Sequence, residues 1–255
     1  MTRANDTRNG LLSVLGTTIL AAACTTGGMT SGMTNVAPRS EATPTPTGSS
    51  EPTGSLALRY VALGDSYTIG TSVGETERWP NQLSERVPGL RLVANLGVNG
   101  FTSADTIDVE LPRLDALDPQ IVSLLIGVND VVQGVPPETY RRNVEAILDD
   151  LVARVGASRV LVVTTPDFTV TPAGADYGDP ARQSAGIREA NRVLAAAAAA
   201  RGVAVVDISD ISLRAKDARR LVAGDGLHPS GEQYRFWVDR IAPAIAELVA
   251  RTEAP

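Results

Sequence analysis

Few residues in this sequence can form disulfides, bind metals or stack on sugars. Cysteine and histidine each occur once, as Cys24 and His228, and aromatic residues make up 4% of the chain. One cysteine cannot form an internal disulfide, and one cysteine with one histidine cannot build a Cys/His metal cluster. So few aromatic residues also argue against a long carbohydrate-binding platform. We therefore expect neither an internal crosslink nor a metal site.

Clusters of basic residues are missing as well. The net charge is -6, and no run is rich in lysine or arginine. Nucleic acids and anionic membrane surfaces attract basic patches, so we expect neither as a partner. A membrane would be reached only through a lipid anchor near the N-terminus.

Residues 1–24 have the pattern of an export signal. An apolar run over residues 11–23 follows two arginines and is too short to span a bilayer as an ordinary helix. Cys24 comes directly after Ala21-Ala22-Ala23, and this run resembles the lipobox of bacterial lipoproteins, in which the cysteine is lipidated. Alternatively, the alanines form an ordinary A-x-A cleavage site and the protein is secreted freely. We expect an exported protein of the cell envelope, anchored at Cys24.

The next segment, residues 25–55, is rich in threonine, glycine, serine and proline. It has almost nothing to bury, so we expect a disordered tether. Residues 56–255 are long enough for one sizeable core, which predicts a single folded domain.

In that domain, short apolar runs alternate with longer helical patterns, which is typical of a parallel sheet covered on both faces. The pattern predicts strands over residues 59–63, 91–95, 121–126, 159–164 and 203–206, and helices over residues 79–86, 103–111, 137–155, 182–200 and 232–250. We therefore predict a flavodoxin-like three-layer α/β/α sandwich with a central five-stranded parallel sheet. In such folds the ligand site lies at the carboxyl ends of the strands.

Polar residues follow the predicted strands, at the place where such a site would form. Ser66 comes after the first strand, glycines after the second and Asn129 after the third, while Asp225 and His228 share a late loop. A serine hydroxyl becomes a nucleophile beside an imidazole that a carboxylate orients. Backbone N–H groups and a side-chain amide can stabilise the oxyanion of acyl transfer. Ser66, His228 and Asp225 are thus catalytic candidates, and Ser66 N–H, a glycine N–H and the Asn129 amide are candidate oxyanion donors.

Each candidate also has a structural alternative. Ser66 could cap the following segment, His228 could be a hydrogen-bonded loop residue, and Asn129 could bond its own turn. Asp65 and Asp130 lie next to the candidates, and we expect them to bond loop backbone. Paired-carboxylate chemistry would leave no role for the serine or the histidine.

Four ordered blocks resemble the SGNH branch of the GDSL hydrolases. They are Gly64-Asp65-Ser66, residues 95–103, Gly127-Val128-Asn129-Asp130 and residues 225–229. The Trp79-Pro80 pair also resembles bacterial lysophospholipase and arylesterase-like members. The resemblance implies Ser66 as nucleophile, His228 as base and then acid, Asp225 as its orienter, and Ser66, Gly100 and Asn129 as the oxyanion hole. It implies no metal and no organic cofactor.

The function that follows is hydrolysis of carboxylic esters through an acyl-enzyme on Ser66. Short-chain acyl, aryl and lysophospholipid esters, as small-molecule or lipid substrates, and thioesters all fit. A carbohydrate O-acetyl esterase of the envelope is one alternative, and a non-catalytic envelope binding protein is another. Residues 165–180 are the candidate rim or lid of the site, with an ordinary long connection as the alternative. Five apolar residues near the site are candidates to line an acyl pocket, although apolar residues in such loops more often simply pack: Ile69, Phe101, Val131, Phe168 and Leu227.

Overall fold

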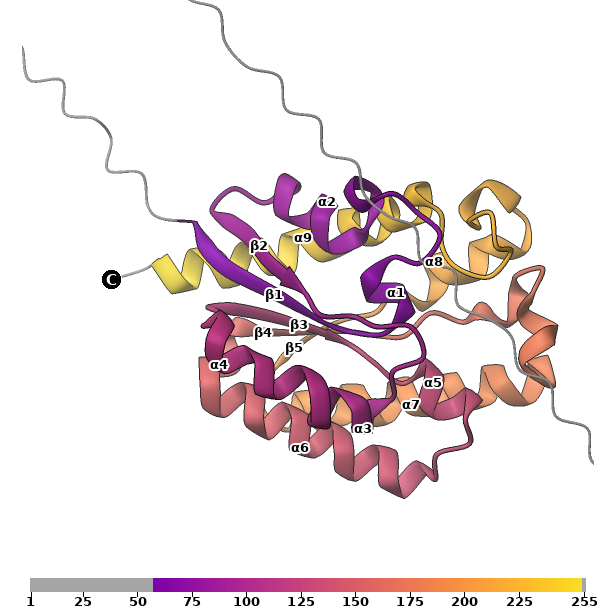
Figure 1. Ribbon diagram of the computed structural model, residues 1–255, viewed down its shortest axis with the longest axis horizontal. Coiled ribbons are helices and arrows are strands. Elements are labelled where there is room, and N and C mark those ends of the chain that lie inside the picture. Colours follow the sequence, from indigo (N-terminus) through magenta and orange to yellow (C-terminus); the bar gives the residue numbers. More distant parts are fainter. Residues whose placement is uncertain (1–56, 254–255) are drawn as a thin grey trace, which may run out of the picture. The chain divides into compact units, whose positions relative to one another are not determined.

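A sheet of five parallel strands forms the centre of the structure, in the order β2-β1-β3-β4-β5 (Figure 1). The strands are β1 (Leu58–Gly64), β2 (Leu90–Asn95), β3 (Ile121–Leu125), β4 (Val160–Val163) and β5 (Ala204–Val206). This is the flavodoxin-like strand order, so the predicted fold class is confirmed. Each predicted strand agrees with the observed one to within a residue at either end.

The computed structural model describes residues 57–253, without the side chain of residue 253. The predicted export signal, Cys24 and the whole predicted tether lie outside the described residues. Within the described part of the chain, no helix is both long enough and apolar enough to cross a membrane.

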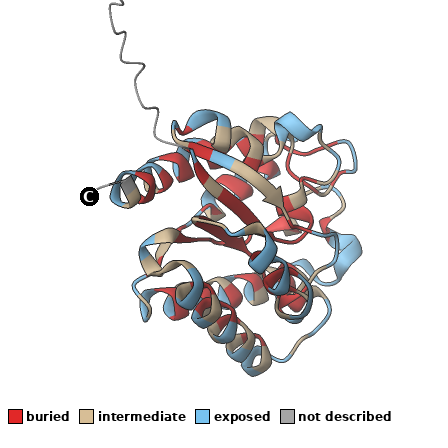
Figure 2. Ribbon diagram, turned by 60° about the vertical axis from the view of Figure 1, so that its left-hand side comes forward, coloured by how far each residue is buried: buried red, intermediate tan, exposed pale blue. Residues whose placement is uncertain are grey.

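Helices cover both faces of the sheet (Figure 1). One face carries α2 (Trp79–Arg86), α8 (Ser209–Leu213) and α9 (Gly231–Glu253). The opposite face carries α6 (Pro137–Val155), α7 (Pro180–Ala199) and a segment that begins with α3 (Ser103–Asp105) and ends with α4 (Leu114–Leu117). Buried residues lie on the strands and on the helix faces that pack against them (Figure 2). The strands are mostly apolar because both faces of the sheet are covered.

The helix predicted over residues 103–111 is continuous but irregular. Between α3 and α4 the chain forms a π-helical turn, Thr106–Glu110, and then a 3-10 turn, Leu111–Arg113. Pro112 explains the change, because it has no N–H for the helical ladder and its ring would collide with the carbonyl of residue 108. Glu110, the last residue of the π-helical turn, is fully buried.

Four short helices escaped the sequence analysis: α1 (Ser66–Ile69), α5 (Val128–Val132), α4 and α8. Of these, α1 and α5 follow β1 and β3, at the carboxyl edge of the sheet. A single turn is too short to show helical periodicity in the sequence. The remaining 3-10 turns are Glu75–Glu77, Ala157–Arg159, Phe168–Val170, Gly174–Tyr177, Arg214–Lys216 and Arg219–Leu221.

Candidate active site

Ser66 is the first residue of α1, in a tight turn at the end of β1. Gly64 has φ +149°, and a Cβ there would lie 2.2 Å from the carbonyl oxygen of Leu125, so only glycine fits. Asp65 caps the helix, its Oδ1 accepting a hydrogen bond from the Tyr67 N–H at 2.9 Å. The cap of α1 is therefore Asp65, which leaves the Ser66 hydroxyl free to face the pocket.

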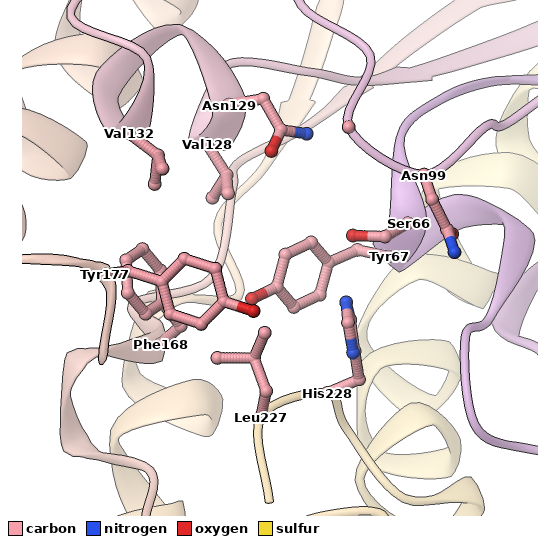
Figure 3. A pocket seen from close by; sticks show the side chains of 11 residues that line it. Ser66, Tyr67, Asn99, Val128, Asn129, Val132, Phe168, Tyr177, Leu227 and His228 are labelled. Carbon is pink, nitrogen blue, oxygen red and sulfur yellow. The ribbon is translucent and has the colours of Figure 1, made fainter. Parts of the chain in front are cut away.

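His228 and Asp225 are held together by their shared loop. Asp225 Oδ2 lies 2.6 Å from Nδ1 of His228, and Asp225 Oδ1 accepts the backbone N–H groups of Leu227 (2.9 Å) and His228 (3.0 Å). The predicted contact between the two side chains is present. With Nδ1 bound to the carboxylate, Nε2 is available to the pocket, and Figure 3 shows the imidazole edge directed toward Ser66.

The Asp225 carboxylate stays ionised in this loop. Partial burial opposes its ionisation, but the hydrogen bonds that it accepts, led by one from Ser72, outweigh this effect and hold the pKa of Asp225 well below its usual range. A negative carboxylate on Nδ1 fixes the imidazole tautomer that a general base needs.

Gly100 and Asn129 lie beside Ser66 at the same pocket. Gly100 has φ +84° and open space around its Cα, so substrate can approach its backbone closely. The Asn129 amide donates one hydrogen bond to the Phe101 carbonyl at 2.9 Å, which leaves a second N–H for the pocket. Among the turn, loop and cap hydrogen bonds of the described residues, neither Ser66 N–H nor Gly100 N–H is a donor. Both donors are therefore free for an oxyanion.

The acids near the site bond backbone, as predicted for Asp65 and Asp130. Asp130 accepts hydrogen bonds from Ser103 through its N–H at 2.9 Å and its hydroxyl at 2.5 Å, which ties the loop after β2 to α5. Sequence reasoning missed Glu110, whose Oε1 accepts the Gly64 N–H at 2.9 Å. Burial raises the pKa of Asp65 to about 7 and that of Glu110 to about 8. No sequence motif marks Glu110; only the folded structure places it next to the turn that carries Ser66.

The pocket that contains Ser66 and His228 has a volume of about 270 Å³. It is lined by Ser66, Tyr67, Asn99, Gly100, Val128, Asn129, Val132, Phe168, Tyr177, Leu227 and His228 (Figure 3). Of the apolar residues predicted to line it, Phe168 and Leu227 do so. The other three candidates, Ile69, Phe101 and Val131, do not line it; Val131 packs against α7 at Gly186, and Val128 and Val132 line the pocket.

The segment between β4 and α7 supplies an aromatic pair to the pocket. The Phe168 and Tyr177 rings meet edge to face with centroids 5.6 Å apart, and Tyr177 is 43% exposed. A backbone hydrogen bond from Ala173 N–H to the Gly226 carbonyl, 3.0 Å long, joins this segment to the histidine loop. The segment thus borders the site, as predicted for residues 165–180.

No group of three or more metal-binding side chains occurs within residues 57–253. The pocket instead combines a hydroxyl, an imidazole with its carboxylate, and free amide donors. These are the groups required for nucleophilic acyl transfer.

The α/β fold and this pocket define a hydrolase of the GDSL type, and the comparison with known families agrees. Residues 62–236 match the model of the GDSL-like lipase/acylhydrolase family, and the chain belongs to this family. The family is one of ester hydrolases, so ester hydrolysis is the activity of its class.

Individual relatives have related names. A GDSL lipase of Mycobacterium tuberculosis is 30% identical over 204 residues, which cover 73% of this chain and 81% of the relative. Thioesterase 1/protease 1/lysophospholipase L1 of Escherichia coli K12 is 28% identical over 108 residues, 41% of this chain and 50% of the relative. A solved structure of a G-D-S-L family protein from Desulfitobacterium hafniense has a TM-score of 0.62 at 20% identity, covering 73% of this chain and 99% of that one. This last likeness supports the fold.

Proposed function

We propose that the protein is a serine hydrolase that cleaves carboxylic esters through an acyl-enzyme on Ser66. The observation that carries the proposal is the 2.6 Å contact between Asp225 Oδ2 and His228 Nδ1, in a loop whose histidine shares one pocket with the serine. An oriented imidazole beside a serine hydroxyl is the arrangement that activates serine as a nucleophile.

In the proposed reaction, Ser66 Oγ attacks the ester carbonyl while His228 Nε2 takes the hydroxyl proton. The resulting oxyanion accepts hydrogen bonds from Ser66 N–H, Gly100 N–H and the free Asn129 N–H. His228 then gives the proton to the leaving alcohol, and Ser66 keeps the acyl group. Water, deprotonated by the same imidazole, attacks this ester; collapse of the second oxyanion releases the acid and returns the proton to Ser66.

The pocket favours a small acyl or aryl group. Its volume of about 270 Å³ lies below the usual range for drug-sized ligands, and much of its wall is apolar. We therefore propose short-chain acyl and aryl esters as substrates. A carbohydrate O-acetyl esterase is the second candidate, since an acetyl group also fits a pocket of this size. The E. coli relative's name makes lysophospholipids and thioesters further members of the test panel.

The proposed location is the cell envelope, through a lipid on Cys24. The Ala21-Ala22-Ala23-Cys24 run supports this proposal. Labelling of expressing cells with an alkyne fatty acid should mark the protein and should not mark Cys24→Ser. An unlabelled wild-type chain found free in the medium would contradict the anchor.

The catalytic proposal is tested with Ser66→Ala and a panel of p-nitrophenyl esters of increasing chain length, acetylated xylo-oligosaccharides, lysophospholipid and acyl thioesters. The variant should lose kcat by at least about 10⁴-fold. Ser158→Ala removes an exposed serine in a 3-10 turn away from the pocket and should keep wild-type rates. A fluorophosphonate probe should label wild type and Ser158→Ala but not Ser66→Ala. Ester turnover by Ser66→Ala, or an unlabelled wild type, would exclude the proposed mechanism and favour a binding protein.

A further inference from the structure

A contact outside the histidine loop reaches the Asp225 carboxylate. The hydroxyl of Ser72 donates a hydrogen bond to Asp225 Oδ2 at 2.7 Å. Ser72 lies in the turn that follows α1, and the contact joins residues separated by 153 positions in the sequence. It therefore links the segment that carries the serine to the loop that carries the histidine.

This contact completes the hydrogen bonding of the carboxylate. Oδ1 accepts two backbone N–H groups of its own loop, and Oδ2 accepts His228 Nδ1 together with the Ser72 hydroxyl. Within the described residues, Ser72 is the one recorded donor to Asp225 from another part of the chain. The backbone of its own loop therefore holds Oδ1, and the Ser72 hydroxyl adds a donor on the Oδ2 side, where the histidine also binds.

The backbone at Ser72 is in an unusual conformation. Its φ is +67°, and in the part of the chain that the structure describes, Asp118 with φ +43° is the other non-glycine residue with a positive φ. Such a conformation strains an L residue with a Cβ. A strained residue that contacts a functional group suggests a functional reason for the strain, and glycine would be the unstrained choice here.

The same turn is tied to the other loops of the site. Thr71 N–H donates to the Ser66 carbonyl at 3.1 Å, and the Thr71 hydroxyl donates to Asn99 Oδ1 at 2.5 Å. Asn99 immediately precedes Gly100. The turn at Thr71 and Ser72 thus contacts α1, the loop of the candidate oxyanion donor and the histidine loop.

From these contacts we propose that Ser72 is a positioning residue: its hydroxyl orients Asp225, and through Asp225 the His228 imidazole, relative to Ser66. The role rests on the proposed function, because it acts on the proposed acid and base. Ser72 itself is not among the residues that line the pocket.

The test compares Ser72→Gly with Ser72→Ala. Both remove the hydroxyl, but glycine relieves the backbone strain and alanine keeps it. We expect both to lower kcat by about 10- to 100-fold, the range of one hydrogen bond to a charged group, with KM within about 2-fold. Ser72→Gly should unfold at a higher temperature than Ser72→Ala, because both variants lose the hydrogen bond and only glycine relieves the strain. The low-field proton NMR signal of His228 Nδ1–H should shift in both variants.

Asp118→Gly is the matched control for strain relief. Asp118 ends α4 in a left-handed conformation, away from the pocket lining. The Asp118→Gly variant should keep the wild-type kcat and the wild-type NMR signal of His228 Nδ1–H.

Two results would overturn the proposal: a Ser72→Gly enzyme with kcat within 2-fold of wild type, or a loss of kcat confined to Ser72→Ala and matched by lower thermal stability. Ser66→Ala, run in parallel, separates this failure from failure of the proposed function. An inactive Ser66→Ala beside a fully active Ser72→Gly rejects the positioning role alone. An active Ser66→Ala rejects the mechanism itself.

Discussion

The N–H of Gly64 donates a hydrogen bond to Oε1 of Glu110, 2.9 Å away, at the last residue of the strand that leads to Ser66. Glu110 is fully buried, and its Oε2 has no hydrogen-bond partner among the described residues. Asp65 is also fully buried close by, and its charge contributes to the raised pKa of Glu110, about 8, after burial itself. Burial therefore favours the protonated, neutral form of Glu110, which accepts the strand-end N–H.

This state makes stability depend on pH. Below about pH 4.5 the Glu110 carboxyl is protonated in both folded and unfolded chains; between that pH and its folded pKa of about 8, only the unfolded chain ionises. The free energy of unfolding should therefore fall as pH rises, by up to about 1.4 kcal/mol per pH unit from this group. Asp65, with a pKa raised to about 7 by burial, adds to the same slope.

Glu110→Gln keeps a neutral acceptor for Gly64 N–H and cannot ionise. Urea unfolding between pH 5.5 and 8.5 should show a shallower decline for this variant than for wild type, with kcat at pH 7 within about 3-fold. Glu110→Leu removes the acceptor and should be less stable at every pH, by about 1–3 kcal/mol. Identical pH slopes for wild type and Glu110→Gln would refute a neutral Glu110.

Asn129→Ala should slow turnover strongly. Loss of one oxyanion donor costs about 10²- to 10³-fold in kcat, and KM should change little because the oxyanion forms after substrate binding. One N–H of the Asn129 amide also donates a hydrogen bond to the Phe101 carbonyl, so the variant could lose stability as well as activity. Thermal unfolding is therefore measured together with the kinetics. Asn81→Ala, in α2 outside this pocket, is the control. Wild-type kcat in a destabilised Asn129→Ala would assign the side chain a structural role only.

Tyr177→Ala should change the preference for acyl length. The half-exposed ring packs on Phe168 at the pocket, so its removal lengthens the apolar space available to substrate. We expect the ratio of kcat/KM for octanoyl over acetyl p-nitrophenyl ester to rise by about 10-fold, within the range set by single methylene contacts. Tyr177→Phe keeps the ring and should keep the wild-type ratio. An unchanged ratio in Tyr177→Ala would show that the acyl chain lies elsewhere.

Gly64→Ala should destabilise the fold more than a glycine replacement in an open turn. A Cβ at Gly64 would meet the Leu125 carbonyl at 2.2 Å, whereas a Cβ at Gly134, also at positive φ, would have no atom within 4 Å. Backbone strain at both sites costs about 1–2 kcal/mol, and the clash adds about 1–3 kcal/mol at Gly64. Urea denaturation measures the difference. Equal losses at the two glycines would mean that the strand end relaxes around the methyl group.

Most of the fold was predictable from the sequence. Apolar runs mark the five strands because both faces of the sheet are covered, and long helices such as α6 show clear periodicity. The positions of Ser66 and Asn129 followed from the rule that parallel strands bring their carboxyl ends to one edge, whereas His228 stood out as the single histidine, in a late loop with Asp225. The one-turn helices α1 and α5 were missed because so short a segment has no period to read.

The surroundings of two residues could not be predicted from the sequence. The helix predicted over residues 103–111 is irregular, and Glu110 within it accepts the Gly64 N–H in the core. Val131 was expected at the pocket, but packing against Gly186 takes it away. In both cases, the side chain packs against residues that are distant in the sequence. The local sequence around it therefore does not show where it packs.

By itself, the sequence determined the fold class, the family and the chemical types at the site, because these depend on periodicity and on short motifs with local meaning. Tertiary structure decided how the site is held. The Ser72 contact with Asp225 spans 153 positions and uses a backbone conformation that serine rarely adopts. Such a contact exists only once the sheet has brought the two loops to one edge, and no local pattern around either residue encodes it.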